Sequence, residues 1–143
     1  MEKRILVVDD DDAIRTLLVT VLRKRRFIVD DARNGEEAIE RARLCRYSIV
    51  LLDLMMPRLN GYEFLGQIEE WPKHQRPLVI VLTAGTEPRD LDPDIVAGTI
   101  RKPFDIELLV DTVSACIQTL GAQEQHKHCP PEGDLEQPAD KPN

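Results

Sequence analysis

The sequence predicts an α/β protein in which helices cover both faces of a five-stranded parallel sheet, a doubly wound domain spanning residues 1–121. Short apolar segments rich in β-branched residues recur along the chain, as is typical of strands buried on both faces. Segments with helical periodicity separate them. This alternation requires crossover connections, which place helices on both sides of a parallel sheet.

Five segments are strand candidates. Four are almost continuously apolar, and the last has a weaker pattern. In chain order they are Ile5–Val8, Phe27–Val29, Ile49–Leu52, Leu78–Leu82 and Gly98–Arg101.

The first helix is predicted from apolar residues at positions i, i+3, i+4, i+7 and i+8, which share one face. These residues are Ile14, Leu17, Leu18, Val21 and Leu22.

Two further helices are predicted from capping signals at their starts. Asn34 and Glu37 stand three residues apart, as do Asn60 and Glu63, and apolar residues follow each pair. This spacing is a variant of the capping box with Asn at the cap position.

The last helix can be capped by Asp105 and stopped by Gly121. Between the fourth and fifth strands, however, Pro88 and Pro93 interrupt any helical stripe. We therefore expect the fourth crossover helix to be short or irregular, a single turn, or a loop.

Residues 122–143 contain four prolines and almost no apolar residues, which predicts a disordered tail. The chain shows no signal peptide pattern and no membrane-spanning segment, so a cytoplasmic location without membrane insertion is expected. The net charge of −7 disfavours direct binding to nucleic acid.

Polar residues follow the predicted strands where each one ends. Asp9 and Asp10 follow the first strand, Asp53 the third, Thr83 the fourth and Lys102 the fifth. In an open parallel sheet, ligands bind at the carboxyl ends of the strands. These side chains should therefore converge at one edge.

Clustered carboxylates repel one another unless a cation lies between them, and hard divalent cations prefer oxygen ligands. Asp10 and Asp53 are candidates for direct ligation of Mg2+, and Asp9 for ligation through water or for orienting the others. Asp53 could then attack a phosphoryl group as a nucleophile. Lys102 and the Thr83 hydroxyl could contact phosphoryl oxygens.

Each residue also has a plainer interpretation. Asp11 and Asp12 precede a helix, where acidic residues serve as caps. Asp53 alone could be a turn residue, and neither Thr83 nor Lys102 is informative by itself. Their joint placement at one predicted edge favours the functional interpretation.

With these residues in place, the sequence resembles the receiver domain of bacterial two-component response regulators over residues 3–120. The resemblance rests on five motifs in order: ILVVDD (5–10), RNGEEAIE (33–40), VLLDLMMPRLNG (50–61), VLTA (81–84) and KPF (102–104). It implies a flavodoxin-like sheet with strand order 2-1-3-4-5.

The resemblance also implies a role for each matching residue. Asp53 would be the phosphoacceptor, Asp9 and Asp10 the acidic pair serving Mg2+ or Mn2+, and the Met55 backbone carbonyl a further metal ligand. Thr83 and Lys102 would contact the phosphoryl group. The bond between Lys102 and Pro103 would be cis.

Two features depart from the family pattern. Thr99 stands three residues before Lys102. Relatives usually carry an aromatic residue there, and its rotamer reports phosphorylation to the surface. The segment from Thr83 to Lys102 is also shortened and broken by prolines. Both changes concern the route by which a signal leaves the domain.

Three functions fit these residues. The leading one is a switch, not a multiple-turnover enzyme, that takes its phosphoryl group from a histidine kinase or histidine phosphotransfer protein and acts on a downstream protein. A Mg2+-dependent phosphatase is an alternative, although Met55 stands where such enzymes usually carry an acidic residue. A degenerate receiver that binds partners without phosphorylation is the third.

Overall fold

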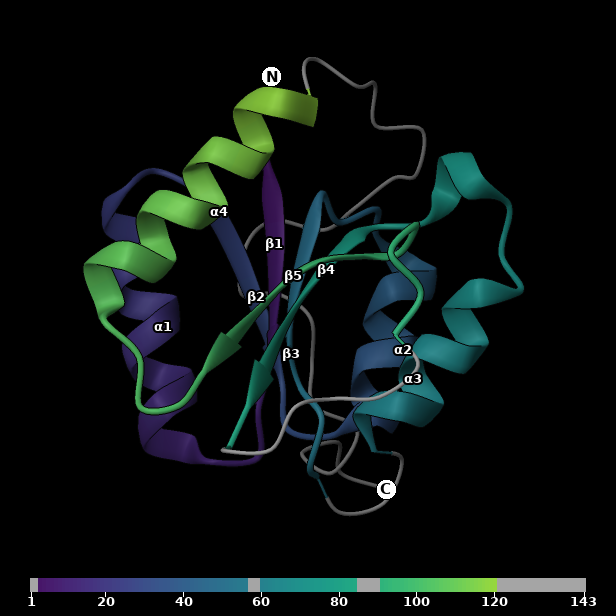
Figure 1. Ribbon diagram of the computed structural model, residues 1–143, viewed down its shortest axis with the longest axis horizontal. Coiled ribbons are helices and arrows are strands. Elements are labelled where there is room, and N and C mark those ends of the chain that lie inside the picture. Colours follow the sequence, from purple (N-terminus) through teal and green to yellow (C-terminus); the bar gives the residue numbers. More distant parts are fainter. Residues whose placement is uncertain (1–2, 57–59, 85–90, 121–143) are drawn as a thin grey trace, which may run out of the picture.

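A parallel sheet of five strands forms the centre of the computed structural model, which describes residues 3–56, 60–84 and 91–120 (Figure 1). The strands are β1 (Arg4–Val8), β2 (Ile28–Ala32), β3 (Ile49–Asp53), β4 (Leu78–Thr83) and β5 (Val96–Arg101). Their order in the sheet is β2-β1-β3-β4-β5, and all neighbours are parallel. The predicted fold class and strand order are thus confirmed.

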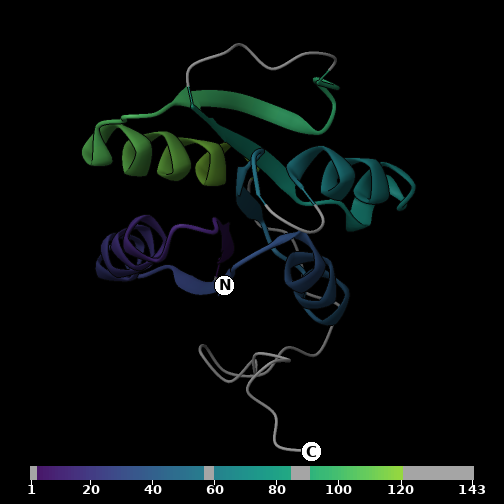
Figure 2. The same ribbon diagram turned by 90° about the horizontal axis from the view of Figure 1, so that it is seen from below.

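Helices lie on both faces of this sheet. They are α1 (Asp12–Lys24), α2 (Gly35–Leu44), α3 (Gly61–Glu69) and α4 (Ile106–Leu120), with a short 3-10 turn at Lys73–Gln75. Figure 2 shows α1 and α4 on one side of the strands and α2 and α3 on the other. The sheet is therefore doubly wound.

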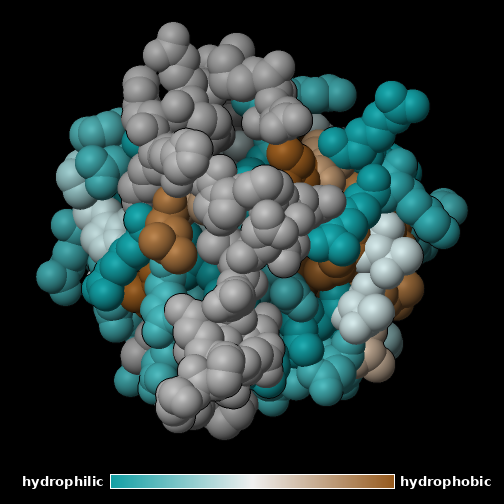
Figure 3. Space-filling model, turned by 180° about the vertical axis from the view of Figure 1, so that it is seen from behind, coloured by the Kyte–Doolittle hydropathy of each residue, from teal (hydrophilic) through white to brown (hydrophobic). Residues whose placement is uncertain are grey.

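The core divides into two apolar clusters, one on each face of the sheet. Ile5 and Val7 of β1 belong to the cluster under α1 and α4, whereas Leu6 and Val8 belong to the cluster under α2 and α3. This alternation follows from the two-residue period of a strand. Seen from behind, the described surface is mostly hydrophilic, with hydrophobic residues only in separate patches (Figure 3).

The buried face of α1 differs from the predicted one. Its buried residues are Arg15, Leu18, Val19 and Leu22, whereas Leu17 is 47% exposed. The prediction assumed that only apolar residues face the sheet. Because Arg15 finds polar partners beneath the helix, the buried face is rotated toward it.

The second strand was also predicted too short, because Asp30 and Asp31 resemble the end of a strand. Asp30 is 4% exposed and lies inside β2. It accepts hydrogen bonds from Arg4 Nε at 2.7 Å and from the Tyr47 hydroxyl at 2.8 Å. These partners compensate for its burial.

The helix starts follow the capping signals. Asn60 and Glu63 form a complete capping box, and the Asp105 side chain accepts from the amides of Glu107 and Leu108. In α2, Asn34 caps the Glu37 amide as expected. The Glu37 side chain, however, accepts from the amide of Arg33 and not from that of Asn34.

The crossover between β4 and β5 is described at Ala84 and from Leu91 onward, and residues 91–95 form a turn without a helix. The amides of Ile95 and Val96 both donate to the Asp92 carbonyl. This part fits the predicted irregular crossover, and β5 begins two residues earlier than predicted. The predictions for Gly121 and the tail lie outside the described residues. None of the described helices has the length and apolar character needed to cross a membrane.

Candidate functional site

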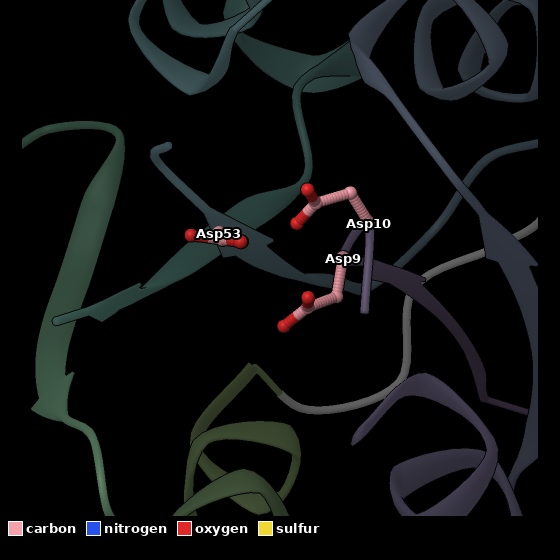
Figure 4. A group of neighbouring side chains, drawn as sticks. All are labelled: Asp9, Asp10 and Asp53. Atoms are coloured by element: carbon pink, nitrogen blue, oxygen red, sulfur yellow. The ribbon is translucent and has the colours of Figure 1, made fainter. Parts of the chain in front are cut away.

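The carboxyl ends of β1 and β3 bring three carboxylates together (Figure 4). Asp9 and Asp10 directly follow β1, and Asp53 is the last residue of β3. One carboxylate oxygen from each lies within 4.8 Å of the others. Asp9 and Asp53 are buried and Asp10 is exposed, so the cluster opens to solvent on the side of Asp10.

Lys102 provides a positive charge next to this cluster. Its Nζ lies 3.1 Å from Asp9 Oδ2 and 3.6 Å from Asp53 Oδ2. The Lys102 amide donates to the Thr83 carbonyl at 2.7 Å, which fixes the residue beside β4. Burial alone would lower the pKa of Lys102, but the hydrogen bond to Asp9 and the charges of Asp9 and Asp53 outweigh it and raise that pKa.

Asp53 is an unusual carboxylate. Burial, with a further contribution from the charges of Asp9 and Asp10, raises its pKa to about 6. The Met55 amide, which donates to Asp53 Oδ1 at 3.1 Å, and the Lys102 charge oppose this increase. Among the described residues, Lys102 is the cation that pairs with these carboxylates, and three carboxylates beside one ammonium favour a further cation.

The other predicted site residues lie at or near this edge. Thr83 is the last residue of β4 and is 8% exposed. Met55 follows Asp53 by two residues, and its side chain is exposed. The bond between Lys102 and Pro103 is cis, as the resemblance implies.

Thr99 is not brought into the cluster. It lies in β5 opposite Val81 of β4 and is exposed. Its neighbour Ile100 packs with the cluster under α1 and α4, so Thr99 belongs to the other face of the strand. A small hollow lies on this face, between α3 and the β4–β5 connection, with Tyr62, Leu65, Ile95 and Val96 in its lining.

The start of α3 is packed against the residue that carries the carboxylate. The Gly61 amide donates to the Leu54 carbonyl at 3.0 Å. A Cβ on Gly61 would lie 2.6 Å from Leu54 Cα and 2.8 Å from the Asp53 carbonyl oxygen. Only glycine allows this close approach, so Gly61 helps to set the backbone of Asp53.

Sequence reasoning missed the contribution of Arg15. Its side chain is 11% exposed and donates to the Asp9 carbonyl at 2.8 Å and to Asp31 Oδ2 at 3.0 Å. The available signal was its position, since Arg15 precedes Leu18, Val19 and Leu22 at helical spacing. A prediction based only on the spacing of apolar residues does not identify a buried arginine.

The donor set fits a hard divalent cation. Carboxylate oxygens are the ligands that Mg2+ prefers, and an open side leaves room for water and for a second oxygen ligand. Asp9, Asp10 and Asp53 could hold the ion.

Comparison with known proteins identifies a family. The family model described as "Response regulator receiver domain" matches residues 5–114. The chain is 41% identical over 120 residues to the transcriptional regulatory protein ResD of Bacillus subtilis and 36% identical over 121 residues to SrrA of Staphylococcus aureus. Each alignment covers 82% of this chain but 49% of the relative, so the chain spans about half the length of these relatives.

Solved structures agree with this result. A CheY-like receiver domain protein of Methanospirillum hungatei superposes with a TM-score of 0.75 at 28% identity, covering 86% of this chain and 100% of the other. TrrA of Thermotoga maritima, solved in complex with Mg2+-BeF, gives a TM-score of 0.70 at 36% identity, covering 80% and 98%.

Proposed function

This chain belongs to the receiver domain family of two-component response regulators, and we propose that it is a phosphoacceptor switch in which Asp53 receives the phosphoryl group. The donor is a histidine kinase or a histidine phosphotransfer protein. The output is contact with a downstream protein, and the domain acts as a switch without multiple turnover.

The observation that carries the proposal is the cluster of three carboxylates with one lysine. Asp9, Asp10 and Asp53 offer ligand atoms within 4.8 Å of one another, and the Lys102 ammonium lies 3.6 Å from Asp53. These residues come from the ends of three different strand segments. Such convergence fits the acceptor site of a phosphoryl transfer better than it fits a structural ion pair.

Asp9, Asp10, Asp53 and the Met55 backbone carbonyl would hold Mg2+ or Mn2+. The ion would offset the repulsion between a carboxylate nucleophile and an anionic phosphoryl donor. The complex of TrrA with Mg2+-BeF supports this assignment.

The side chains then divide the chemistry. An Asp53 oxygen attacks phosphorus, and the bond from phosphorus to the donor breaks, which leaves an aspartyl phosphate. The Lys102 ammonium, already beside Asp53, pairs with a phosphoryl oxygen and the Thr83 hydroxyl donates to another. The added charge, about −1.5 to −2, draws both groups toward residue 53 and can change the adjacent surface.

Incubation with acetyl phosphate and Mg2+, followed by intact mass measurement, tests the proposal. We expect one phosphoryl group on the wild-type chain and none on Asp53→Asn. Asp111→Asn, which removes an exposed carboxylate of α4, is the matched control and should be modified normally. Absence of modification in wild type would favour a degenerate receiver, and repeated hydrolysis of a generic phosphate ester would favour the phosphatase alternative.

A further inference from the structure

The guanidinium of Arg15 lies beneath the loop that carries the acidic pair. Arg15 belongs to the first turn of α1, and its side chain is 11% exposed. Its Nη1 donates to the Asp9 carbonyl at 2.8 Å and its Nε to Asp31 Oδ2 at 3.0 Å, while Nη2 contacts Asp12. One side chain thus connects the end of β1, the start of α1 and the end of β2.

With the Arg15 bond, the amide, carboxylate and carbonyl of Asp9 each have a hydrogen-bond partner. Its amide donates to the Ala32 carbonyl at 3.2 Å, and its side chain accepts from the Asp11 amide at 2.9 Å and from Lys102 at 3.1 Å. The Arg15 bond occupies the remaining polar group, the carbonyl. Asp10 is the next residue in the chain, so the same bond limits where its carboxylate can go.

Asp31 is itself held from the far side of β2. The Arg41 Nε of α2 donates to the Asp31 carbonyl, and Arg41 is 3% exposed. The Arg15 acceptor is the Asp31 carboxylate, whose side chain is 40% exposed, but the backbone that carries it is anchored at the strand end by Arg41.

We propose that Arg15 is a positioning residue that holds the Asp9–Asp10 loop in the geometry that receives a divalent cation. The inference rests on the proposed function, because it concerns the same site. Outer contacts that orient metal ligands typically contribute 10–100-fold to metal affinity. Arginine suits this task because its planar fork can serve several acceptors at once, which a lysine ammonium does not reproduce.

A role of Arg15 through its charge and a role through its position predict opposite changes in cation affinity when the side chain is removed. If Arg15 contributed only its positive charge, its removal would leave the carboxylates more negative and cation affinity would rise. If Arg15 positions the loop, its removal lowers affinity despite the lost repulsion. The sign of the change therefore separates the two roles.

A titration of the full chain with Mn2+, monitored by the electron paramagnetic resonance signal of the free ion, measures whether affinity rises or falls. We expect about tenfold weaker binding for both Arg15→Gln and Arg15→Lys, since neither can bridge the three acceptors. The loss should persist at high salt, where a purely electrostatic effect would be screened. Arg25→Gln is the matched control, because Arg25 lies at the other end of α1 and, among the described residues, pairs with the exposed Asp111 at 3.4 Å.

Circular dichroism and thermal unfolding without metal establish that each variant is folded. If Arg15→Gln does not fold, Arg15→Lys keeps the buried charge and gives the decisive value, since a charge-only role predicts unchanged affinity. Unchanged or tighter Mn2+ binding by a folded variant would overturn the inference and leave the proposed function intact. A wild-type chain that takes up neither Mn2+ nor a phosphoryl group would overturn both.

Discussion

Asp53 holds its proton more tightly in the folded protein than in the unfolded chain. Its pKa rises to about 6, compared with about 3.9 for an unperturbed aspartate. The contribution of protonated Asp53 to the stability of the folded protein is therefore fully present below about pH 4, and it is lost as the pH rises through about 6. Because the buried anionic form of Asp53 is disfavoured, a bound cation would stabilise it, which suits the role proposed for this residue.

The metal-free protein should accordingly become less stable between about pH 4 and pH 6 because of this residue. Asp53→Asn keeps a neutral side chain, so in EDTA at about pH 7 it should be more stable than wild type by roughly 2–3 kcal/mol. Urea unfolding of both proteins across this range measures the difference. Excess Mg2+ should reduce it by binding the ionised wild type. Parallel pH profiles would contradict the argument.

Among the described residues, Met55 is the one expected to influence how long the phosphoryl group stays on Asp53. The Met55 amide donates to Asp53 Oδ1, and its exposed side chain offers no group able to orient an attacking water. We predict that phosphorylated protein loses its phosphoryl group over minutes or longer in Mg2+ buffer. Met55→Asn, which adds a polar group, should shorten the lifetime. Loss within seconds from the wild type would refute the prediction.

Among the secondary-structure elements, the start of α3 contacts the backbone of Asp53, the proposed phosphoacceptor, through Gly61. Any side chain at this position meets the backbone of Asp53 and Leu54. Gly66 offers a comparison within the same helix, because a Cβ added there meets nothing within 4 Å.

Gly61→Ala should therefore destabilise the protein by about 1–3 kcal/mol and slow phosphorylation by displacing residue 53. Gly66→Ala should stabilise it by up to about 1 kcal/mol, because alanine favours a helix more than glycine does. Chemical denaturation and acetyl phosphate labelling measure both effects. Normal labelling of a destabilised Gly61→Ala would show that α3 does not set the site.

The elements also show where a pattern-based prediction succeeds. Capping pairs and uniformly apolar strands were located correctly because their signals are local. The buried side of α1 and the length of β2 were not, since Arg15 and Asp30 are charged residues buried by partners distant in sequence. Such residues carry no apolar signal, and only the assembled structure explains their burial.

In the molecule as a whole, the proposed acceptor site and the surface near Thr99 lie apart, so we expect them to be separable. The sequence located the converging strand ends, because parallel topology brings them to one edge whatever lies between. It did not reveal that Arg15 and Gly61 meet this edge, because the bond of Arg15 to the Asp9 carbonyl and the close approach of Gly61 to the Asp53 carbonyl both involve backbone atoms.

Thr99→Tyr tests this separation. Because Thr99 is exposed and outside the carboxylate cluster, the substitution should change the rate of labelling by acetyl phosphate by no more than about twofold. A loss of tenfold or more would mean that the exposed face of β5 takes part in the chemistry.

In the proposed mechanism, Asp53 itself carries the phosphoryl group. Borohydride reduces an aspartyl phosphate to homoserine, so treatment of the phosphorylated chain followed by peptide sequencing in a mass spectrometer identifies the residue. We predict homoserine at position 53 alone, dependent on both Mg2+ and acetyl phosphate. Homoserine at position 9 or 10, or at none of the three, would contradict the account.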